Sequence, residues 1–185
     1  MKSDFPHAYN NRGIAYRRMG DYEHALADYD AAIRLKSDYA NVYNNRGYVR
    51  RKLGRYAEAI ADYDAAIRLK PGYVTALFNR GYARARLGQD IEAIADYSRV
   101  LKIAPDDVLA LYNRAASRVK IGKLEAARAD LDRVIALQPD LAKAYLRRAL
   151  VLRKLGREKA AQADYRKVVA LKENYAAARF ARLFE

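Results

Sequence analysis

The residues of this 185-residue chain whose types and spacing could do chemistry are arginines and aspartates that recur at a fixed interval. An arginine returns every 34 residues, and an aspartate follows each arginine by 16 residues. We expect these charges to form ion pairs, within one repeat or across a repeat boundary, because burying an unpaired charge is costly. The two sets are Arg12, Arg46, Arg80, Arg114 and Arg148, and Asp28, Asp62, Asp96, Asp130 and Asp164.

A second arginine column accompanies the first. Arg50, Arg84 and Arg118 each follow an arginine of the first column by four residues. Like charges at this spacing repel each other on a helix. One interpretation is that both arginine columns share the aspartates.

Catalytic chemistry is not indicated by the sequence. His7 and His24 stand at different places in the repeat and lack the spacing of metal ligands. The chain has no cysteine, which excludes disulfides and thiol chemistry. No glycine-rich phosphate loop occurs. We therefore expect a protein that is not an enzyme and that uses no cofactor or metal.

The charge balance favours an anionic partner. The formal net charge is +14, which suits acidic proteins, nucleic acid or anionic surfaces, although basic residues also serve solubility. No apolar run reaches the length of a membrane span, and residues 1–5 lack a hydrophobic signal region. We expect a cytoplasmic protein. Phe5 occupies the column of Tyr39, Tyr73 and Tyr175, so the chain could be trimmed from a longer protein.

A repeated unit positions these charges. Its five copies span residues 6–39, 40–73, 74–107, 108–141 and 142–175. Apolar residues at positions 3, 4, 8 and 14 of each copy have the period of a helix, and a second such stripe begins at position 20. Glycine at position 15 ends the first helix, and Pro71, Pro105 and Pro139 end second helices. Each copy is therefore predicted to be a helical hairpin that must stack on its neighbours.

The unit resembles the tetratricopeptide repeat, whose marks are a large residue at position 4, a small residue at 8, alanine at 20, an aromatic residue at 24, alanine at 27 and proline at 32. In the second copy these marks are Tyr43, Gly47, Ala59, Tyr63, Ala66 and Pro71. The resemblance implies one all-α domain over residues 1–185. Its fold would be a right-handed superhelical array, or α-solenoid, of five hairpins with a short terminal helix at residues 176–185. It also implies a non-catalytic scaffold for protein–protein interaction.

The resemblance further implies a groove lined by positions 2, 5, 6, 9, 12 and 13 of the first helices. Asparagines there could bond the backbone of an extended peptide, aromatic rings supply contact area, and basic residues suit an acidic segment. Two alternatives are that the asparagines only bond a neighbouring helix and that the basic edge is an ordinary solvated face. The candidate residues are Asn10, Asn11, Asn44, Asn45, Tyr48, Arg51, Lys52, Phe78, Asn79, Tyr82, Arg86, Tyr112, Asn113, Lys143 and Arg147.

Two sharper hypotheses concern this groove. Asn113, Lys143 and Arg147 match three of the five residues with which some co-chaperone arrays clamp a terminal carboxylate, so we expect a weaker carboxylate site there. The rival function is nonspecific binding of single-stranded nucleic acid, with bases stacked on Tyr48 and Tyr82. The nearly uniform asparagines argue against sequence readout. Association of two chains through the array ends is also open.

Overall fold

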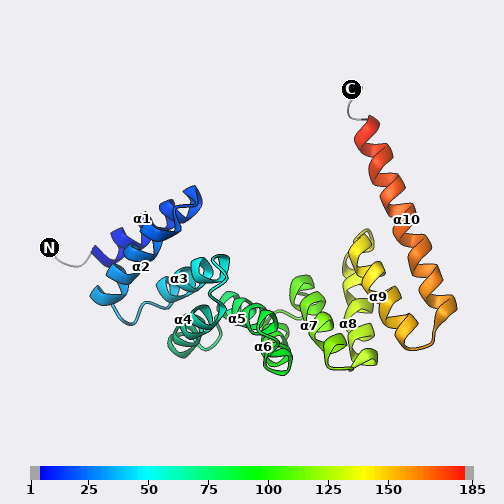
Figure 1. Cartoon of the computed structure of the whole chain (residues 1–185), viewed down its shortest axis with the longest axis horizontal. Coiled ribbons are helices and arrows are strands. Elements are labelled where there is room, and N and C mark those ends of the chain that lie inside the picture. The colour runs from blue at the N-terminus through cyan, green and yellow to red at the C-terminus, as the bar shows by residue number, and fades with distance from the viewer. Residues whose placement is uncertain (1–4, 182–185) are drawn as a thin grey trace. The chain divides into compact units, whose positions relative to one another are not determined.

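The computed structural model describes the backbone of residues 5–181 and the side chains of residues 5–172. This part of the chain consists of α-helices without any strand (Figure 1). The predicted all-helical fold of repeated hairpins is therefore confirmed. The helices are α1 (Phe5–Met19), α2 (Tyr22–Leu35), α3 (Ala40–Lys52), α4 (Tyr56–Leu69), α5 (Val74–Arg86), α6 (Asp90–Ile103), α7 (Val108–Lys120), α8 (Leu124–Leu137), α9 (Ala142–Lys154) and α10 (Glu158–Ala181).

Glycine and proline set the helix ends as the sequence predicts. The turn glycine of every hairpin has a positive φ, from 73° at Gly156 to 82° at Gly20, which other residues rarely adopt. Helix α4 ends at Leu69, two residues before Pro71, because proline cannot continue the backbone hydrogen bonds. Each repeat thus folds as two helices with a tight turn between them.

The two helices of a hairpin approach each other closely at position 8. A Cβ atom on Gly47 would lie 2.8 Å from Cε1 of Tyr63. The ring of Tyr63 is fully buried, as are those of Tyr29 and Tyr97 at the same position of the first and third repeats. Glycine on the first helix therefore makes room for a buried tyrosine on the second.

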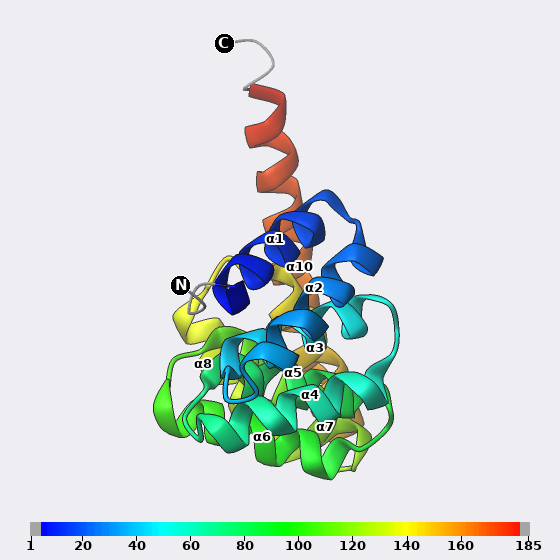
Figure 2. The ribbon, with the colours of Figure 1, turned by 90° about the vertical axis from the view of Figure 1, so that its left-hand side faces the viewer.

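The chain divides into two compact units, residues 1–103 and 104–185. In the first unit α3 packs against α4 and α4 against α5, and α3 also contacts α1 and α5 (Figure 2). In the second unit α8 packs against α7 and α9, and α9 packs against α10. Both units are built from the same hairpin. The single repeat domain expected over residues 1–185 stays a prediction.

The structure differs from the sequence prediction at the C-terminal end. A separate short helix was expected at residues 176–185, but α10 runs without a break from Glu158 to Ala181. Glu173 stands where three other repeats have proline, so nothing in the sequence forces the helix to end there. Residues 182–185 lie outside the described part of the chain.

The predicted ion pairs between the two helices of each hairpin are confirmed. In all five repeats the arginine of the first helix contacts the aspartate of the second, with N–O distances from 2.5 to 2.7 Å. The second arginine column shares these aspartates: Arg50 lies 2.9 Å from Asp62 and Arg84 lies 2.8 Å from Asp96. Each such aspartate therefore neutralises one arginine and partly neutralises another.

Further ion pairs link neighbouring repeats. Nη1 of Arg46 donates to Asp30, Nη1 of Arg80 to Asp64 and Nη1 of Arg148 to Asp132, at 2.6, 2.6 and 2.9 Å. Burial by itself lowers the pKa of Arg80. Hydrogen bonds and charge attraction to Asp96 and Asp64 outweigh this effect, so the pKa of Arg80 lies above its usual value. We call the complete set of these contacts the arginine–aspartate ladder.

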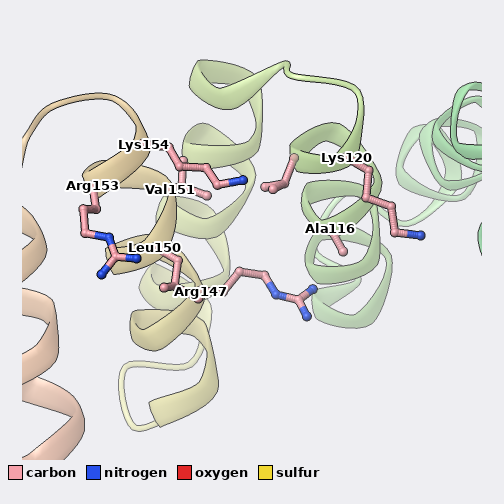
Figure 3. Close-up of a pocket in the computed structure, with 8 residues that line it drawn as sticks. Ala116, Lys120, Arg147, Leu150, Val151, Arg153 and Lys154 are labelled. Carbon is pink, nitrogen blue, oxygen red and sulfur yellow. The ribbon is translucent and has the colours of Figure 1, made fainter.

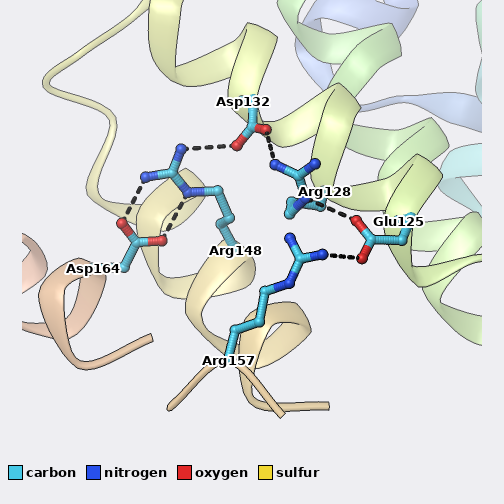
Figure 4. A network of polar contacts seen from close by, with 6 residues as sticks. All are labelled: Glu125, Arg128, Asp132, Arg148, Arg157 and Asp164. Atoms are coloured by element: carbon cyan, nitrogen blue, oxygen red, sulfur yellow. Dashed lines mark hydrogen bonds and ion pairs between the residues drawn. The ribbon is translucent and has the colours of Figure 1, made fainter. Parts of the chain in front are cut away.

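The ladder merges with a charge network in the second unit (Figure 4). Arg148 contacts Asp164 on α10 and Asp132 on α8, and Asp132 also accepts from Arg128 at 2.7 Å. Glu125 accepts from Arg128 and from Arg157, which precedes α10. Three arginines and three carboxylates thus balance each other across three helices.

Removing one ladder aspartate should destabilise the fold. Asp96 is 1% exposed and accepts hydrogen bonds from Arg80 and Arg84. We expect Asp96→Asn to lower the free energy of unfolding by about 3 kcal/mol in urea titrations, because it removes the buried anion of Arg84 and one of the two anions of Arg80. Glu92→Gln, at an exposed position of the same helix, should change stability by less than about 0.5 kcal/mol. Equal stability of the two variants would contradict this account of the ladder.

The buried tyrosines should make the fold sensitive to alkali. Burial raises the pKa of Tyr29 to about 12, while a tyrosine in the unfolded chain has a pKa of about 10. The stability contributed by the neutral hydroxyl is complete below about pH 10 and is lost as the pH rises through about 12.

Urea midpoints at about pH 9 and about pH 11 test this expectation. Tyr29→Phe should lose less stability between the two pH values than the unchanged protein, because it has no hydroxyl to ionise at that position. Tyr22→Phe, at a partly exposed position of the same helix, should behave like the unchanged protein. An identical pH response of Tyr29→Phe and the unchanged protein would refute the prediction.

Candidate functional site

A pocket of about 310 Å³ lies between α7 and α9 in the second unit (Figure 3). Its floor is apolar and is formed by Ala116, Val119, Leu150 and Val151. Its other lining residues are all cationic, and no carboxylate of the described residues is among them. We call this the α7–α9 pocket; its cations are Lys120, Arg147, Arg153 and Lys154.

The pocket continues into a longer basic surface on α9. Lys143, Arg147, Leu150 and Lys154 follow one another at intervals of four, three and four residues, so they lie along one face of that helix. Tyr112 of α7 extends this surface. The guanidinium carbon of Arg147 lies 4.1 Å from the centre of the Tyr112 ring, and Nζ of Lys143 lies 5.2 Å from it.

The three residues expected to hold a carboxylate meet only in part. Lys143 and Arg147 gather on the ring of Tyr112, as described above. Asn113, however, donates its side-chain N–H to the carbonyl oxygen of Leu109 at 2.8 Å, one turn earlier in its own helix. One donor of Asn113 is therefore already engaged, and the cationic part of the predicted trio is the part that the structure brings together.

Three of the four pocket cations have no carboxylate partner in the described part of the chain. Among the described residues, no carboxylate forms an ion pair with Arg147, Arg153 or Lys154. A cavity on α8, α9 and α10 makes the contrast clear, because its arginines are paired with Asp132, Asp164 and Glu125 (Figure 4). Of the two cavities, only the α7–α9 pocket presents cations without such anions.

In the first unit, asparagines at positions 5 and 6 of the repeat contact one another. Nδ2 of Asn45 donates to Oδ1 of Asn10 on the preceding first helix at 3.0 Å, and Nδ2 of Asn79 lies 3.5 Å from Oδ1 of Asn44. Asn10, Asn44 and Asn79 are buried. These contacts support the alternative interpretation that the asparagines join neighbouring helices. Asn11 is exposed and contacts Asn10 at 3.5 Å.

The aromatic residues of the first unit are covered by cations. The guanidinium carbon of Arg17 lies 5.0 Å from the ring centre of Tyr48. The guanidinium carbon of Arg51 lies 4.9 Å from the ring centres of both Tyr48 and Tyr82. We call this set of four residues the arginine–tyrosine stack. It joins α1, α3 and α5 through cation–π contacts.

Three further residues of the candidate set lie in the first unit. Lys52 lies 5.8 Å from the ring centre of Tyr48, and Arg86 lies 5.5 Å from that of Tyr56. Phe78 packs on the buried ring of Tyr97 at a centroid distance of 5.7 Å. The sequence-derived set left out Lys120, Arg153 and Lys154. They occupy the same two columns as Arg51, Lys52 and Arg86, so the repeat pattern already marks them as basic positions of the groove.

In the part of the chain that the structure covers, no three histidine or carboxylate side chains come together to hold a metal ion. Within the same residues, no helix combines the length and the apolar character needed to cross a membrane.

The repeat geometry agrees with known protein families. A TPR repeat model matches residues 13–54 and 47–88, and tetratricopeptide repeat models match residues 74–107, 109–140 and 142–175. The chain therefore belongs to the tetratricopeptide repeat family. Comparison with curated proteins found no match.

Solved structures of other proteins share this fold. A double mutant of MamA from RS-1 matches with a TM-score of 0.91 and 20% identity over 95% of this chain and 98% of that one. MamA 41-end from Desulfovibrio magneticus RS-1 matches with a TM-score of 0.90 and 21% identity, over 94% and 98% of the two chains. YrrB, described as a TPR protein with an unusual peptide-binding site, matches with a TM-score of 0.82 and 22% identity, over 94% and 90%. At these identities the similarity establishes the fold alone.

Proposed function

We propose that this protein is a non-catalytic scaffold. It binds an extended, acidic segment of a partner protein through the groove formed by the first helices of its hairpins. The α7–α9 pocket is the principal part of this site. The observation that carries the proposal is the combination of an apolar floor with a rim of cations and no carboxylate. Such a pocket suits a segment in which a bulky aliphatic side chain is flanked by glutamate or aspartate.

The charge argument rests on the contrast with the arginine–aspartate ladder. Ladder arginines are neutralised by the protein itself, whereas Arg147, Arg153 and Lys154 have no such anion among the described residues. Clustered like charges repel one another, and an acidic ligand relieves that repulsion. The same charges attract an acidic segment from a distance and favour it over basic ones.

The length of the basic surface favours an extended ligand. Lys154 lies eleven residues after Lys143 on the α9 face, which corresponds to about 16 Å at the helical rise of about 1.5 Å per residue. An extended segment covers that distance with about five residues. Leu150 lies between Arg147 and Lys154 on this face, so an aliphatic side chain of the ligand would enter the pocket between its carboxylates. Burying one leucine side chain there contributes about 2 kcal/mol.

The cation–π contacts weigh against nucleic acid as the ligand. In proteins that bind single-stranded nucleic acid, the bases stack on exposed faces of aromatic rings. Tyr48 has Arg17 and Arg51 over its ring, and Tyr112 has Arg147 over its ring. Base stacking would have to displace these guanidinium groups, whereas a carboxylate can approach them from their edges. An acidic peptide is therefore the better match.

Fluorescence anisotropy with a labelled peptide tests the proposal. The probe has one leucine between two pairs of glutamates, and its control has glutamine at the four acidic positions. The double variant Arg147→Glu, Lys154→Glu should bind the acidic probe at least about tenfold more weakly, a loss of about 1.4 kcal/mol. The glutamine control should bind weakly to both proteins.

A matched charge control makes the test specific. Arg34→Glu with Arg68→Glu changes the net charge equally, at exposed positions of α2 and α4. This variant should bind the acidic probe almost as well as the unchanged protein. An equal loss in both double variants, or no binding of the acidic probe at all, would refute the proposal. Tight binding of a single-stranded oligonucleotide that survives the pocket variant would instead support the nucleic-acid function.

A further inference from the structure

We propose that Arg51 is a second, separate binding point in the first unit, a receptor for an oxyanion with two accessible oxygens, and a phosphoryl group in particular. The inference goes beyond the proposed function, because it concerns α1, α3 and α5 and does not involve the α7–α9 pocket. It rests on how the guanidinium of Arg51 is held and on what it lacks.

The guanidinium of Arg51 contacts two aromatic rings. Its central carbon lies 4.9 Å from the ring centre of Tyr48 and 4.9 Å from that of Tyr82. Cation–π contacts with two rings restrict the rotation of the guanidinium. A guanidinium that has already lost part of this freedom loses less entropy when it binds an anion.

Arg51 also lacks an anionic partner. The preceding residue, Arg50, has Nη1 2.9 Å from Asp62. Among the described residues no carboxylate forms an ion pair with Arg51. Its Nε atom is buried and has no hydrogen-bond partner, so an anion would reach the guanidinium through its terminal nitrogens. A cation that contacts two rings and has no carboxylate partner among the described residues is prepared for an anion from outside.

The surroundings of Arg51 show the same shortage of acceptors. The hydroxyl of the fully buried Tyr63 has the Arg51 side chain as a neighbour, and neither this hydroxyl nor Nε of Arg51 makes a well-formed hydrogen bond. The pattern recurs in the first repeat, where Nε of Arg17 and the hydroxyl of Tyr29 are buried and unpartnered. Buried polar groups are usually hydrogen-bonded, so these exceptions show that the protein alone leaves the hydrogen bonding of both arginines incomplete.

The class of ligand follows from the shape and number of the cations. A planar guanidinium edge binds two oxygens of a carboxylate or phosphoryl group side by side, which chloride cannot imitate. Arg17, Arg51 and Lys52 all lie within 5.8 Å of the centre of the Tyr48 ring. Three cations around one ring favour the doubly charged phosphoryl group over the singly charged carboxylate.

Nuclear magnetic resonance of the full chain tests this receptor. The Nε–Hε signal of Arg51 is identified by its loss in Arg51→Lys, which keeps the charge and removes the planar edge. Inorganic phosphate should shift this signal saturably, with an apparent Kd at least about threefold lower than that for the exposed Arg34. Sodium chloride at equal ionic strength should give no saturable shift. The same response at Arg51 and Arg34, or the same response to chloride, would overturn the inference.

Two aromatic variants separate the stack from general effects on the fold. Tyr82→Leu removes one ring over Arg51, and Tyr56→Leu removes the ring over Arg86. Leucine already occurs in both columns, as Leu150 and Leu124, so both variants should fold, which circular dichroism can verify. Tyr82→Leu should weaken phosphate binding at Arg51 at least about threefold, and Tyr56→Leu should leave it unchanged. Equal binding in both variants would refute the role of the stack.

Peptides identify the source of the oxyanion. Two peptides that differ only in carrying phosphoserine or glutamate at one position are titrated under the same conditions. Tighter binding of the phosphoserine peptide at Arg51 supports the phosphoryl assignment, and equal or weaker binding refutes it. The pocket residues Arg147 and Lys154 are unchanged in all of these proteins, so failure here leaves the proposed function standing, and the reverse also holds.

Discussion

The need to neutralise arginine inside a helical hairpin governs much of this structure. An arginine that lies between two packed helices keeps its charge, since its pKa stays high, and it must therefore meet an anion there. The aspartate 16 residues later meets this need in every repeat. Because Arg46, Arg80 and Arg148 reach a second aspartate on the preceding hairpin, the same requirement also fixes how neighbouring repeats stack. These ion pairs therefore contribute to the specificity of helix packing as well as to the stability of the fold.

The ladder changes what the net charge of +14 means. Many of the arginines are occupied by aspartates and contribute no attraction for a partner. Among the described residues, cations without such an aspartate include Arg147, Arg153 and Lys154 of the α7–α9 pocket and Arg17 and Arg51 of the arginine–tyrosine stack. These two places differ in character, since the pocket has an apolar floor and the stack has aromatic rings in contact with guanidinium groups. The similarity of the five repeats thus conceals two different binding surfaces.

The sequence predicts the hairpins and the ion pairs within them, because glycine, proline and the 34-residue period are local signals. The sequence does not predict the contacts that depend on packing between hairpins. The ion pairs of Asp30, Asp64 and Asp132 were missed, because the arginine that each contacts belongs to the following repeat. The cations over the ring of Tyr48 were missed for the same reason, whereas the contacts of the asparagines with neighbouring helices were one of the two interpretations that the sequence allowed. The length of α10 was underestimated, because the absence of proline at Glu173 permits a longer helix without requiring one.

The contact between Gly47 and Tyr63 has a consequence for how such a protein can evolve. The first three repeats combine glycine on one helix with a fully buried tyrosine on the other, whereas the fourth combines Ala115 with Leu131. The fifth combines Ala149 with Tyr165, and that tyrosine is only partly buried. Single helices are therefore not interchangeable between repeats. Duplication or exchange preserves the core when a whole hairpin moves as one module.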